Sequence, residues 1–382
     1  MTIDVQGTWD EKFAPVVEAF GRNIDAGLDL GASYCHTVEG ETVVDIWGGW
    51  LDREKTEPWR RDTLINVFST TKTMAALTCL LLADRGELDL HEPVVNFWPE
   101  FGANGKEDIA TRHFLSHSAG LAGLDDMVTE ETLYDQDAMA GLLAKQKPWW
   151  EDRSKSGYHA FTQGNLLGEV VRRKTGKSLG TVFRDEIAGP LGADFFIGVP
   201  PERDAQVTTL WPAEDPAHHM LMGIAPYDTL AGRVGRSPAI DSNWSRTIPW
   251  RRAEIPAGGG HGNARSVAEI HKILANGGVA DGKRFMSEAG CKTIFEVQTH
   301  GTDLVLGTPI TFGMGFGLNS ELVPMGPDKH ICYWGGWGGS SAVINMDRRT
   351  TTAFVPNQMI QRELDRPDER VAAIAVAMMS IA

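Results

Sequence analysis

The sequence lacks the features that mark membrane-spanning, secreted and nucleic-acid-binding proteins. No apolar run reaches the roughly 18 residues needed to cross a bilayer, and the N-terminal residues have neither the basic nor the apolar region of a signal peptide. Basic residues are scarce, with 36 Lys and Arg against 51 Asp and Glu and a net charge of −15. Nucleic acids and anionic membranes bind basic surfaces. We therefore expect neither as a partner, and we expect a cytoplasmic protein.

Cysteine is rare as well. The chain has four cysteines, which are far apart and form no Cys-x-x-Cys pair. Spacing of this kind favours buried free thiols in a reducing compartment over a disulfide framework. The four are Cys35, Cys79, Cys291 and Cys332.

Metal-binding patterns are sparse too. His113 and His117 are four residues apart, but no Glu follows His113 and no third ligand is placed by the sequence. The sequence predicts no metal ion and no cofactor. His117, beside Ser118 and Gly120, is expected to have a capping or supporting role instead.

Two familiar hydrolase signatures, Gly-x-Ser-x-Gly and His-Glu-x-x-His, are also missing. What the chain does contain is Ser69 followed three residues later by Lys72, and no other serine has Lys at that spacing. Apolar β-prone residues precede Ser69 and helix-forming residues follow, so both side chains lie on one face of a first helical turn. The helix N-terminus favours an oxyanion, and a buried neutral Lys can accept the serine proton. The alternative is an ordinary serine N-cap.

Two further stretches could complete such a site. Tyr158 precedes a predicted helix and could relay the serine proton to a leaving group, since a nearby Lys⁺ would lower the pKa of its phenol. The alternative is an amphipathic Tyr at a loop–helix boundary. The run from 335 to 339 has four glycines in five positions, which suits close approach of a ligand to the backbone. An N–H there could join that of Ser69 in an oxyanion hole; the alternative is a bulged strand or a turn.

The pattern along the chain predicts an α/β unit made from the two termini and a helical, loop-rich block between them. We expect residues 1–75 and 257–382 to form the first domain, residues 76–256 the second, and the active site to lie at their interface. Twelve Trp residues suggest an aromatic-walled cleft. Gly258 to Gly262 is interpreted as a flexible junction, with His261 as a loop or cleft-rim residue rather than a base.

The elements expected along the chain are helices and strands of ordinary length. The helices are Glu11 to Ala26, Ser69 to Arg85, Thr111 to His117, Thr129 to Lys145, Thr162 to Lys174, Ala264 to Ala275 and Pro367 to Met379. The strands are Ala32 to Val38, Glu41 to Trp47, Thr63 to Phe68, Thr311 to Leu318, His330 to Trp334, Ser340 to Met346 and Thr352 to Val355.

In order and spacing, Ser69-Thr70-Thr71-Lys72, Tyr158 and Trp334-Gly335-Gly336 resemble the motifs of the serine β-lactamase superfamily. The chain looks most similar to the class C β-lactamase-like esterases called family VIII carboxylesterases. The resemblance implies an α/β (α+β) fold of the β-lactamase/transpeptidase type, with an antiparallel sheet flanked by the terminal helices. It also implies a nucleophilic Ser69 and a proton-transfer pair of Lys72 and Tyr158.

The same resemblance implies that the backbone N–H groups of Ser69 and Trp337 form the oxyanion hole and that Trp334, Gly335 and Gly336 contact substrate. β-Lactamases of this class carry Asn where this chain has Ala160, and Lys-Thr-Gly in place of Trp334-Gly335-Gly336. Loss of that Lys and Asn moves recognition from β-lactams toward neutral esters.

The expected function is that of a serine carboxylesterase acting on a small-molecule ester. A β-lactamase, a D-Ala-D-Ala peptidase, an amide hydrolase or a transacylase on the same scaffold is the alternative. A non-catalytic binding protein that kept the cleft is a more remote one. The acyl chain, the alcohol and the oligomeric state stay open.

Overall fold

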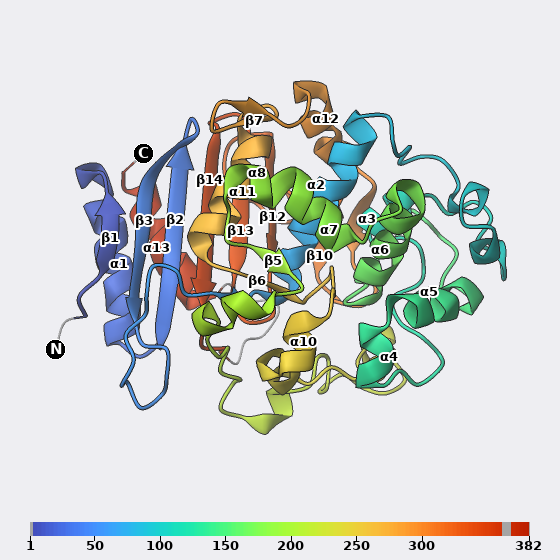
Figure 1. Ribbon diagram of the computed structural model, residues 1–382, viewed down its shortest axis with the longest axis horizontal. Helices are drawn as coiled ribbons and strands as arrows, with labels where there is room; N and C mark the ends of the chain where they lie inside the picture. Colours follow the sequence, from blue (N-terminus) through green and yellow to red (C-terminus); the bar gives the residue numbers. More distant parts are fainter. Residues whose placement is uncertain (1–2, 361–367, 382) are drawn as a thin grey trace.

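A nine-stranded antiparallel sheet joins the two ends of the chain in the computed structural model, which describes residues 3–360 and 368–381 (Figure 1). The strand order is β1-β3-β2-β14-β13-β12-β11-β10-β9. The strands are β1 Gln6–Trp9, β2 Gly31–Val38, β3 Glu41–Gly49, β9 Thr299–Thr302, β10 Pro309–Phe312, β11 Gly317–Leu318, β12 Ile331–Gly335, β13 Ser341–Asn345 and β14 Thr350–Pro356. Strand β2 pairs with β14, with Tyr34 opposite Phe354, so segments from both ends of the chain are hydrogen-bonded to each other within the sheet.

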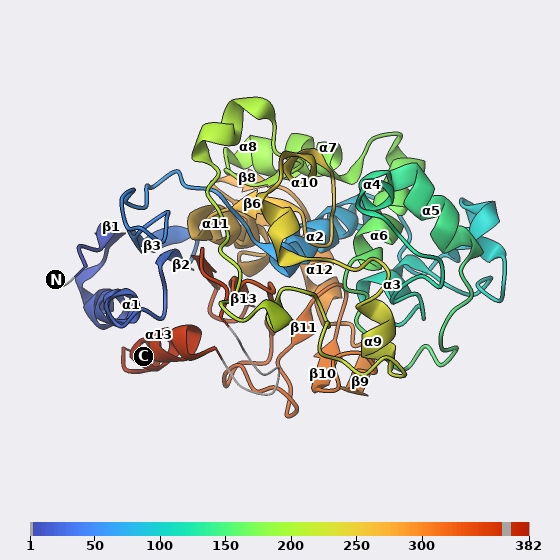
Figure 2. The same cartoon turned by 90° about the horizontal axis from the view of Figure 1, so that it is seen from below.

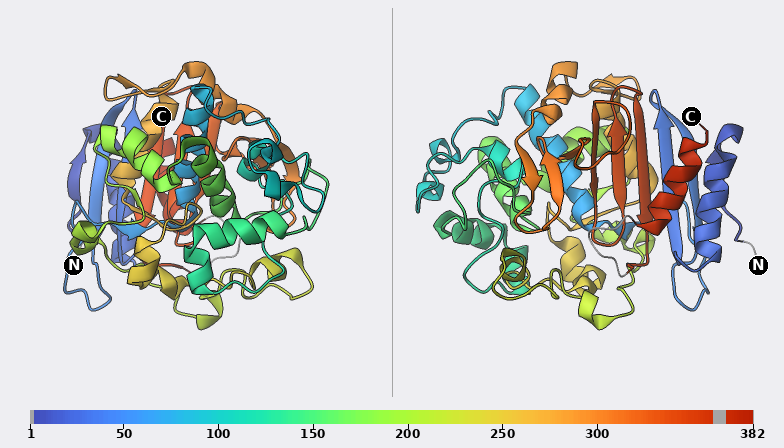
Figure 3. Two further views of the ribbon diagram at one scale, coloured as in Figure 1. Left: turned by 45° about the vertical axis from the view of Figure 1, so that its right-hand side comes forward. Right: turned by 180° about the vertical axis from the view of Figure 1, so that it is seen from behind.

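Helices cover both faces of this sheet. Helices α1 (Ala14–Asp25) and α13 (Glu369–Met379) lie side by side on one face, and α11 (Ala264–Ala275) lies on the other (Figures 2 and 3). The apolar residues of α1 recur at helical spacing, so Val16 and Phe20 are buried against the sheet beside Ile46. The predicted fold class, an antiparallel sheet flanked by the terminal helices, is confirmed.

A buried ion cluster ties α13 to the N-terminal half of the sheet. The Arg370 guanidinium, which is fully buried, donates to Asp29 at 2.9 Å and to Asp368 at 2.9 and 2.7 Å. Burial raises the pKa of Asp29 to about 6, while the charge of Arg370 opposes that rise. A removed partner would therefore leave an uncompensated charge in the interior.

The rest of the molecule is mainly helical. Helix α2 (Thr71–Asp84) lies in the interior of the molecule, and its residues from Thr71 to Leu82 are buried (Figure 1). The other helices are α3 Thr111–Leu115, α4 Glu130–Tyr134, α5 Gln136–Lys145, α6 Thr162–Thr175, α7 Leu179–Phe183, α8 Gly189–Leu191, α9 Leu230–Val234, α10 Ile248–Arg252 and α12 Glu288–Lys292. Shorter helical turns span Glu11–Phe13, Phe68–Thr70, Val94–Asn96, Pro99–Gly102, Arg184–Ala188, Pro201–Gln206, Pro216–His218, Ser242–Arg246 and Thr293–Phe295. The division of the chain into two domains stays a prediction.

Several predicted elements have different bounds in the structure. The predicted helix from Thr129 to Lys145 is two helices, because Asp135 leaves the helical conformation and its carboxylate caps α5 by accepting from the Ala138 N–H. The predicted strand from Thr311 to Leu318 is broken into β10 and β11. Strands β1 and β9 were not predicted, since each has only four residues and includes a glycine. Pro367, the predicted start of the last helix, lies outside the described residues.

The glycine run from 258 to 262 is not a flexible junction. Strand β6 (Gly260–Gly262) lies between β4 (Ile65–Asn66) and β5 (Phe196–Ile197) in a small second sheet. A Cβ atom on Gly260 would lie 2.5 Å from Thr71 Oγ1, so glycine is required here for close packing. His261 lies in β6 and is 1% exposed, so its predicted position in a loop or at the rim of a cleft is wrong.

All four cysteines are free and buried, as the sequence predicts. Burial raises the pKa of Cys79 and of Cys291 to about 12. Over the described ranges, no helix combines the length and the apolar character that crossing a membrane requires.

Candidate active site

Ser69 lies in the 3₁₀ turn Phe68–Thr70, which continues directly into α2. Two neighbouring segments hold the residue before this turn. The Val67 N–H donates to the Gly260 carbonyl at 2.9 Å, and the Ser340 hydroxyl donates to the Val67 carbonyl at 2.8 Å. Phe68 has a φ of +40°, an unfavourable value for a bulky residue. Its buried ring packs on Trp250 and Trp337, and these contacts hold the turn in place.

The structure brings together the three side chains that the sequence singled out. The Tyr158 hydroxyl donates to Ser69 Oγ at 2.7 Å, and Lys72 Nζ lies 3.3 Å from the same oxygen. Tyr158 comes from the loop before α6, 89 residues along the chain from Ser69. Ser69 is thus a hydroxyl with a potential base and a potential acid both within hydrogen-bonding distance.

Lys72 is 1% exposed, and burial holds the pKa of its amine well below the usual 10.5. Its Nζ donates to the carbonyl oxygens of Ala160 and Ala257, at 2.6 and 2.8 Å. A neutral amine has two N–H groups and one lone pair. The two carbonyls occupy both N–H groups, so the lone pair is directed at the third neighbour, Ser69 Oγ. Lys72 can therefore accept the serine proton.

Tyr158 differs from its sequence-based prediction in one respect. A nearby Lys⁺ was expected to lower the pKa of its phenol, but burial raises that pKa, and the negative charge of Asp303 adds to the rise. The prediction was wrong because Lys72 is itself buried and favours its neutral form. The phenol therefore stays protonated and acts as a hydrogen-bond donor to Ser69.

The glycine run lies against the Ser69 turn. Trp334 and Gly335 end β12, and Trp337 sits in a turn closed by the Gly339 N–H, which donates to the Gly336 carbonyl at 2.9 Å. A Cβ atom on Gly336 would clash with the Val67 carbonyl oxygen. Within the described ranges, neither the Ser69 nor the Trp337 backbone N–H donates to another protein group. Both N–H groups are available to an oxyanion.

An aromatic wall stands beside these groups. The Trp334 ring lies 5.5 Å from that of Tyr158 and 5.3 Å from that of Phe312, between ring centroids. His117 packs edge-on against Tyr158 at 4.8 Å. Its Nδ1 accepts from the His159 N–H at 3.1 Å, which gives His117 a supporting position. These rings line one side of the Ser69 site; the aromatic-walled cleft expected from the Trp content stays a prediction.

Three groups at the site were not identified from the sequence. The carbonyls of Ala160 and Ala257 hold Lys72, and carbonyls carry no sequence signal because every residue has one. Asp303 is fully buried, and its Oδ1 accepts from the Tyr158 N–H at 3.0 Å. The surrounding Thr-Asp-Leu is ordinary loop sequence, so nothing marks this Asp in advance.

No cluster of three or more His, Cys, Asp or Glu residues suited to a metal ion occurs in residues 3–360 and 368–381. His113 Nδ1 accepts from the Ala110 N–H at 2.9 Å, so this ring caps the start of α3.

A sequence model of the Beta-lactamase family matches residues 20–377, which include all of these groups. The chain belongs to the beta-lactamase family. The "Esterase/beta-lactamase LipL" of Mycobacterium tuberculosis is 38% identical over 364 residues, which are 93% of this chain and 83% of that protein. The crystal structure of a family VIII carboxylesterase is 36% identical, with a TM-score of 0.91 over 100% of both chains.

A second solved structure that is similar to this chain carries a different name. A penicillin-binding protein homologue from Caulobacter crescentus is 34% identical, with a TM-score of 0.88 over 99% of this chain and 100% of that one. Within the family, the predicted resemblance to the class C-like esterases is confirmed.

Proposed function

We propose that the protein is a serine ester hydrolase, more narrowly a carboxylesterase that acts on small neutral esters through an acyl-Ser69 intermediate. The observation that carries the proposal is the hydrogen-bonded group of Ser69, Lys72 and Tyr158. The esterase names of two similar proteins support it.

In the proposed acylation step, Ser69 Oγ attacks the ester carbonyl carbon while its proton moves to the lone pair of Lys72 Nζ. The carbonyl oxygen becomes an oxyanion and is held by the N–H groups of Ser69 and Trp337. When the intermediate collapses, the C–O bond to the alcohol breaks and Tyr158 gives its proton to the leaving oxygen. The Lys72 ammonium then returns a proton to the phenolate, which restores both groups.

Deacylation repeats these steps with water in place of the serine. The water oxygen attacks the acyl carbon, its proton passes to the Lys72–Tyr158 pair, and the Ser69 oxygen leaves with a proton. The products are a carboxylic acid and free enzyme. Trp334 and Ala160 stand where Lys and Asn would bind the charged and amide parts of a β-lactam, which supports neutral esters as substrates.

The test is the hydrolysis of p-nitrophenyl acetate by the Ser69→Ala variant. We expect kcat/KM to fall by at least about 10³-fold, because the nucleophile is removed, while circular dichroism stays unchanged. Ser380→Ala, at an exposed serine, is the matched control and should keep full activity. Turnover retained by Ser69→Ala would contradict the proposal.

The second candidate is hydrolysis of lactams, peptides or amides by the same groups, and the similarity to a penicillin-binding protein homologue favours it. Nitrocefin turnover measured beside ester turnover separates the two. A transacylase would form a new ester when an acceptor alcohol is added. A non-catalytic binding protein would leave Ser69 unlabelled by a fluorophosphonate probe.

A further inference from the structure

His117 binds the residue on each side of Tyr158. Its carbonyl accepts from the Gly157 N–H at 2.9 Å, and its ring Nδ1 accepts from the His159 N–H at 3.1 Å. Between these two contacts, the Tyr158 N–H donates to Asp303 Oδ1 at 3.0 Å. Three consecutive N–H groups are therefore bound by groups from distant segments, so the backbone that carries Tyr158 is fixed at three successive points.

The double contact requires an unusual backbone conformation at His117. This residue follows α3, which ends at Leu115, and its φ of +60° lies in the left-handed region that residues with a side chain rarely adopt. In this conformation the carbonyl and the ring of one residue face the same loop. Such a backbone is unfavourable and persists where surrounding contacts require it, and the two bonds to residues 157 and 159 are contacts of that kind.

The His117 ring also supports the phenol itself. The rings of His117 and Tyr158 meet edge-on with centroids 4.8 Å apart, and Phe312 packs edge-on against His117 at 4.9 Å. Backbone and ring contacts together determine where the Tyr158 hydroxyl lies, 2.7 Å from Ser69 Oγ.

The bond from His159 needs a neutral imidazole, because a protonated Nδ1 would set one N–H group against another. His117 is 2% exposed, and burial holds its pKa well below the usual 6.5. The positive charges that His159 and Lys72 carry when protonated lower this pKa further. His117 Nδ1 is therefore an acceptor at neutral pH.

We propose that His117 is a positioning residue for Tyr158 and that, through Tyr158, it enables the protein to release alkyl alcohols. An alkoxide is a strong base and leaves readily only when a proton is delivered to its oxygen. A nitrophenolate is a far weaker base and depends less on that proton. The inference rests on the proposed function and deepens it, because it names esters of alkyl alcohols as the substrates that need a fixed Tyr158.

The test measures kcat/KM for two acetates that differ only in the alcohol, p-nitrophenyl acetate and ethyl acetate. Both form the same acetyl-Ser69, so kcat/KM reports the acylation step, in which the alcohol leaves. The ratio of the two values does not depend on how much of a preparation is folded. A purely structural defect therefore leaves this ratio unchanged.

Two variants suit the left-handed backbone at position 117, because Gly and Asn both tolerate a positive φ. Asn carries an oxygen on Cγ where His carries Nδ1, whereas Gly offers no acceptor. We expect His117→Gly to lower kcat/KM on ethyl acetate by about 10²-fold, as misplacing a reacting group by about 1 Å does, and to raise the p-nitrophenyl-to-ethyl ratio at least about tenfold. His117→Asn should keep the ratio of the wild type.

His271→Ala is the matched control. His271 is 1% exposed, and its Nδ1 lies 2.7 Å from the Val267 carbonyl oxygen within α11. The variant removes an equally buried ring from another part of the fold and should keep the wild-type ratio. A ratio that His117→Gly leaves unchanged would overturn the inference, and so would an equal rise in the Gly and Asn variants.

Hydrogen exchange is a second measurement, and it needs no substrate. The His159 N–H should exchange about fivefold faster in His117→Gly, as loss of one hydrogen bond predicts, and at the wild-type rate in His117→Asn. Unchanged exchange in both variants would contradict the positioning role.

The wild type separates this inference from the proposed function. Turnover of p-nitrophenyl acetate without turnover of ethyl acetate would overturn the inference, while the proposed ester hydrolysis stands. A wild type that hydrolyses neither ester would contradict the proposed function and the inference with it.

Discussion

At the residue scale, the chemistry of Lys72 depends on where the fold places it. An exposed lysine is charged at neutral pH and cannot accept a proton. Burial lowers the pKa of Lys72, and two carbonyl acceptors orient its amine. These two effects together favour a neutral amine, which is the form that the proposed role of Lys72 as the base requires.

The first prediction concerns the pH dependence of ester hydrolysis. Lys72 must be neutral to accept a proton, so kcat/KM should rise with pH through its lowered pKa. Tyr158 must stay protonated, and its raised pKa should keep the rate on a plateau up to at least pH 10. A pH–rate profile of the free enzyme with p-nitrophenyl acetate measures both limits, after correction for spontaneous hydrolysis. A rate that declines between pH 7 and 9 would contradict the assignment.

The second prediction uses Lys72→Arg and Tyr158→Phe. Arginine keeps the charge and the donors but cannot lose a proton, so Lys72→Arg should abolish acylation. Tyr158→Phe keeps the ring and should lower the acylation rate by about 10²–10⁴-fold, the usual contribution of a proton-transfer group. Stopped-flow measurement of the p-nitrophenol burst separates acylation from deacylation. A mild effect of Tyr158→Phe would assign proton transfer to Lys72 alone.

At the scale of elements, the candidate site depends on contacts between segments that are distant in sequence. The turn after β12 packs on Val67 and thereby sets the spacing between the N–H groups of Ser69 and Trp337. The loop after β9 reaches the other side of the site, where Asp303 accepts from the N–H groups of Tyr158, Val305 and Leu306 at 3.0, 2.9 and 2.9 Å.

The third prediction compares alanine at two neighbouring glycines. A Cβ atom on Gly336 would clash with the Val67 carbonyl, whereas one on Gly335 would meet only the Ser340 carbonyl, at 3.1 Å. Gly336→Ala should therefore move the two N–H groups apart and lower kcat by about 10²–10³-fold, as loss of one oxyanion donor does. Gly335→Ala should lower kcat far less. Equal losses in the two variants would show that the spacing of the N–H groups is not what matters.

The fourth prediction concerns Asp303 as a positioning residue for Tyr158. Asp303→Asn keeps an oxygen acceptor and should retain most activity, whereas Asp303→Ala leaves buried N–H groups without their acceptor. We expect Asp303→Ala to lower kcat with little change in KM, because substrate contacts are intact. The ratio of kcat between the Asn and Ala variants is the measurement. If kcat fell equally in the two variants, the carboxylate charge rather than the hydrogen bond would be essential.

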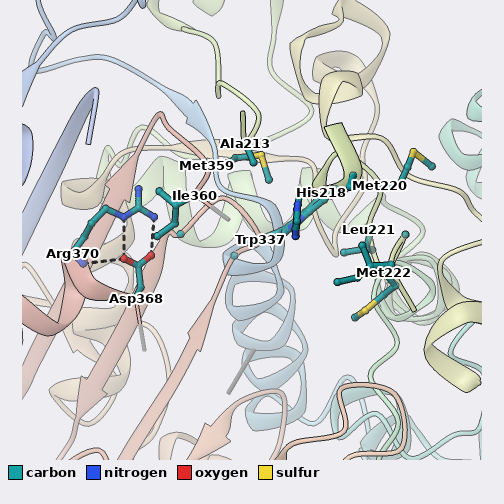
Figure 4. A pocket seen from close by; sticks show the side chains of 15 residues that line it. Ala213, His218, Met220, Leu221, Met222, Trp337, Met359, Ile360, Asp368 and Arg370 are labelled. Atoms are coloured by element: carbon teal, nitrogen blue, oxygen red, sulfur yellow. Dashed lines mark hydrogen bonds and ion pairs between the residues drawn. The ribbon is translucent and has the colours of Figure 1, made fainter. Parts of the chain in front are cut away.

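At the scale of the whole molecule, the two ends of the chain depend on each other. Strands β2 and β14 pair along their length, and Arg370 of α13 joins Asp29, which follows α1. The same guanidinium lines a pocket of about 180 Å³ beside Trp337 (Figure 4). One buried residue therefore contributes both to global stability and to the shape of that pocket.

The fifth prediction is that Arg370→Gln destabilises the protein by about 3–5 kcal/mol, because it leaves buried carboxylates without their cation. Arg22→Gln breaks an exposed pair with Glu18, whose side chains are 68% and 71% exposed, and should change stability much less. Urea unfolding followed by tryptophan fluorescence compares the two variants. Equal unfolding midpoints would show that the buried cluster adds little.

The sequence by itself determined the groups that are neighbours along the chain. Ser69 and Lys72 are three residues apart in one helical segment, and the glycine run carries its own signature, so both could be found without a structure. The amphipathic spacing of α1 and the β-prone residues of β2 and β3 could be identified for the same reason, since local patterns predict elements of this kind.

Only the tertiary structure decided the rest. It placed Tyr158 against Ser69, raised the pKa of that phenol where the sequence suggested the opposite, and recruited Asp303 and two backbone carbonyls. It also showed that Gly260 serves close packing, although glycine in a sequence is equally compatible with flexibility. The pocket beside Trp337 joins segments near residues 220 and 360. Burial and long-range contact set these properties, and neither is encoded in the spacing of residues along the chain.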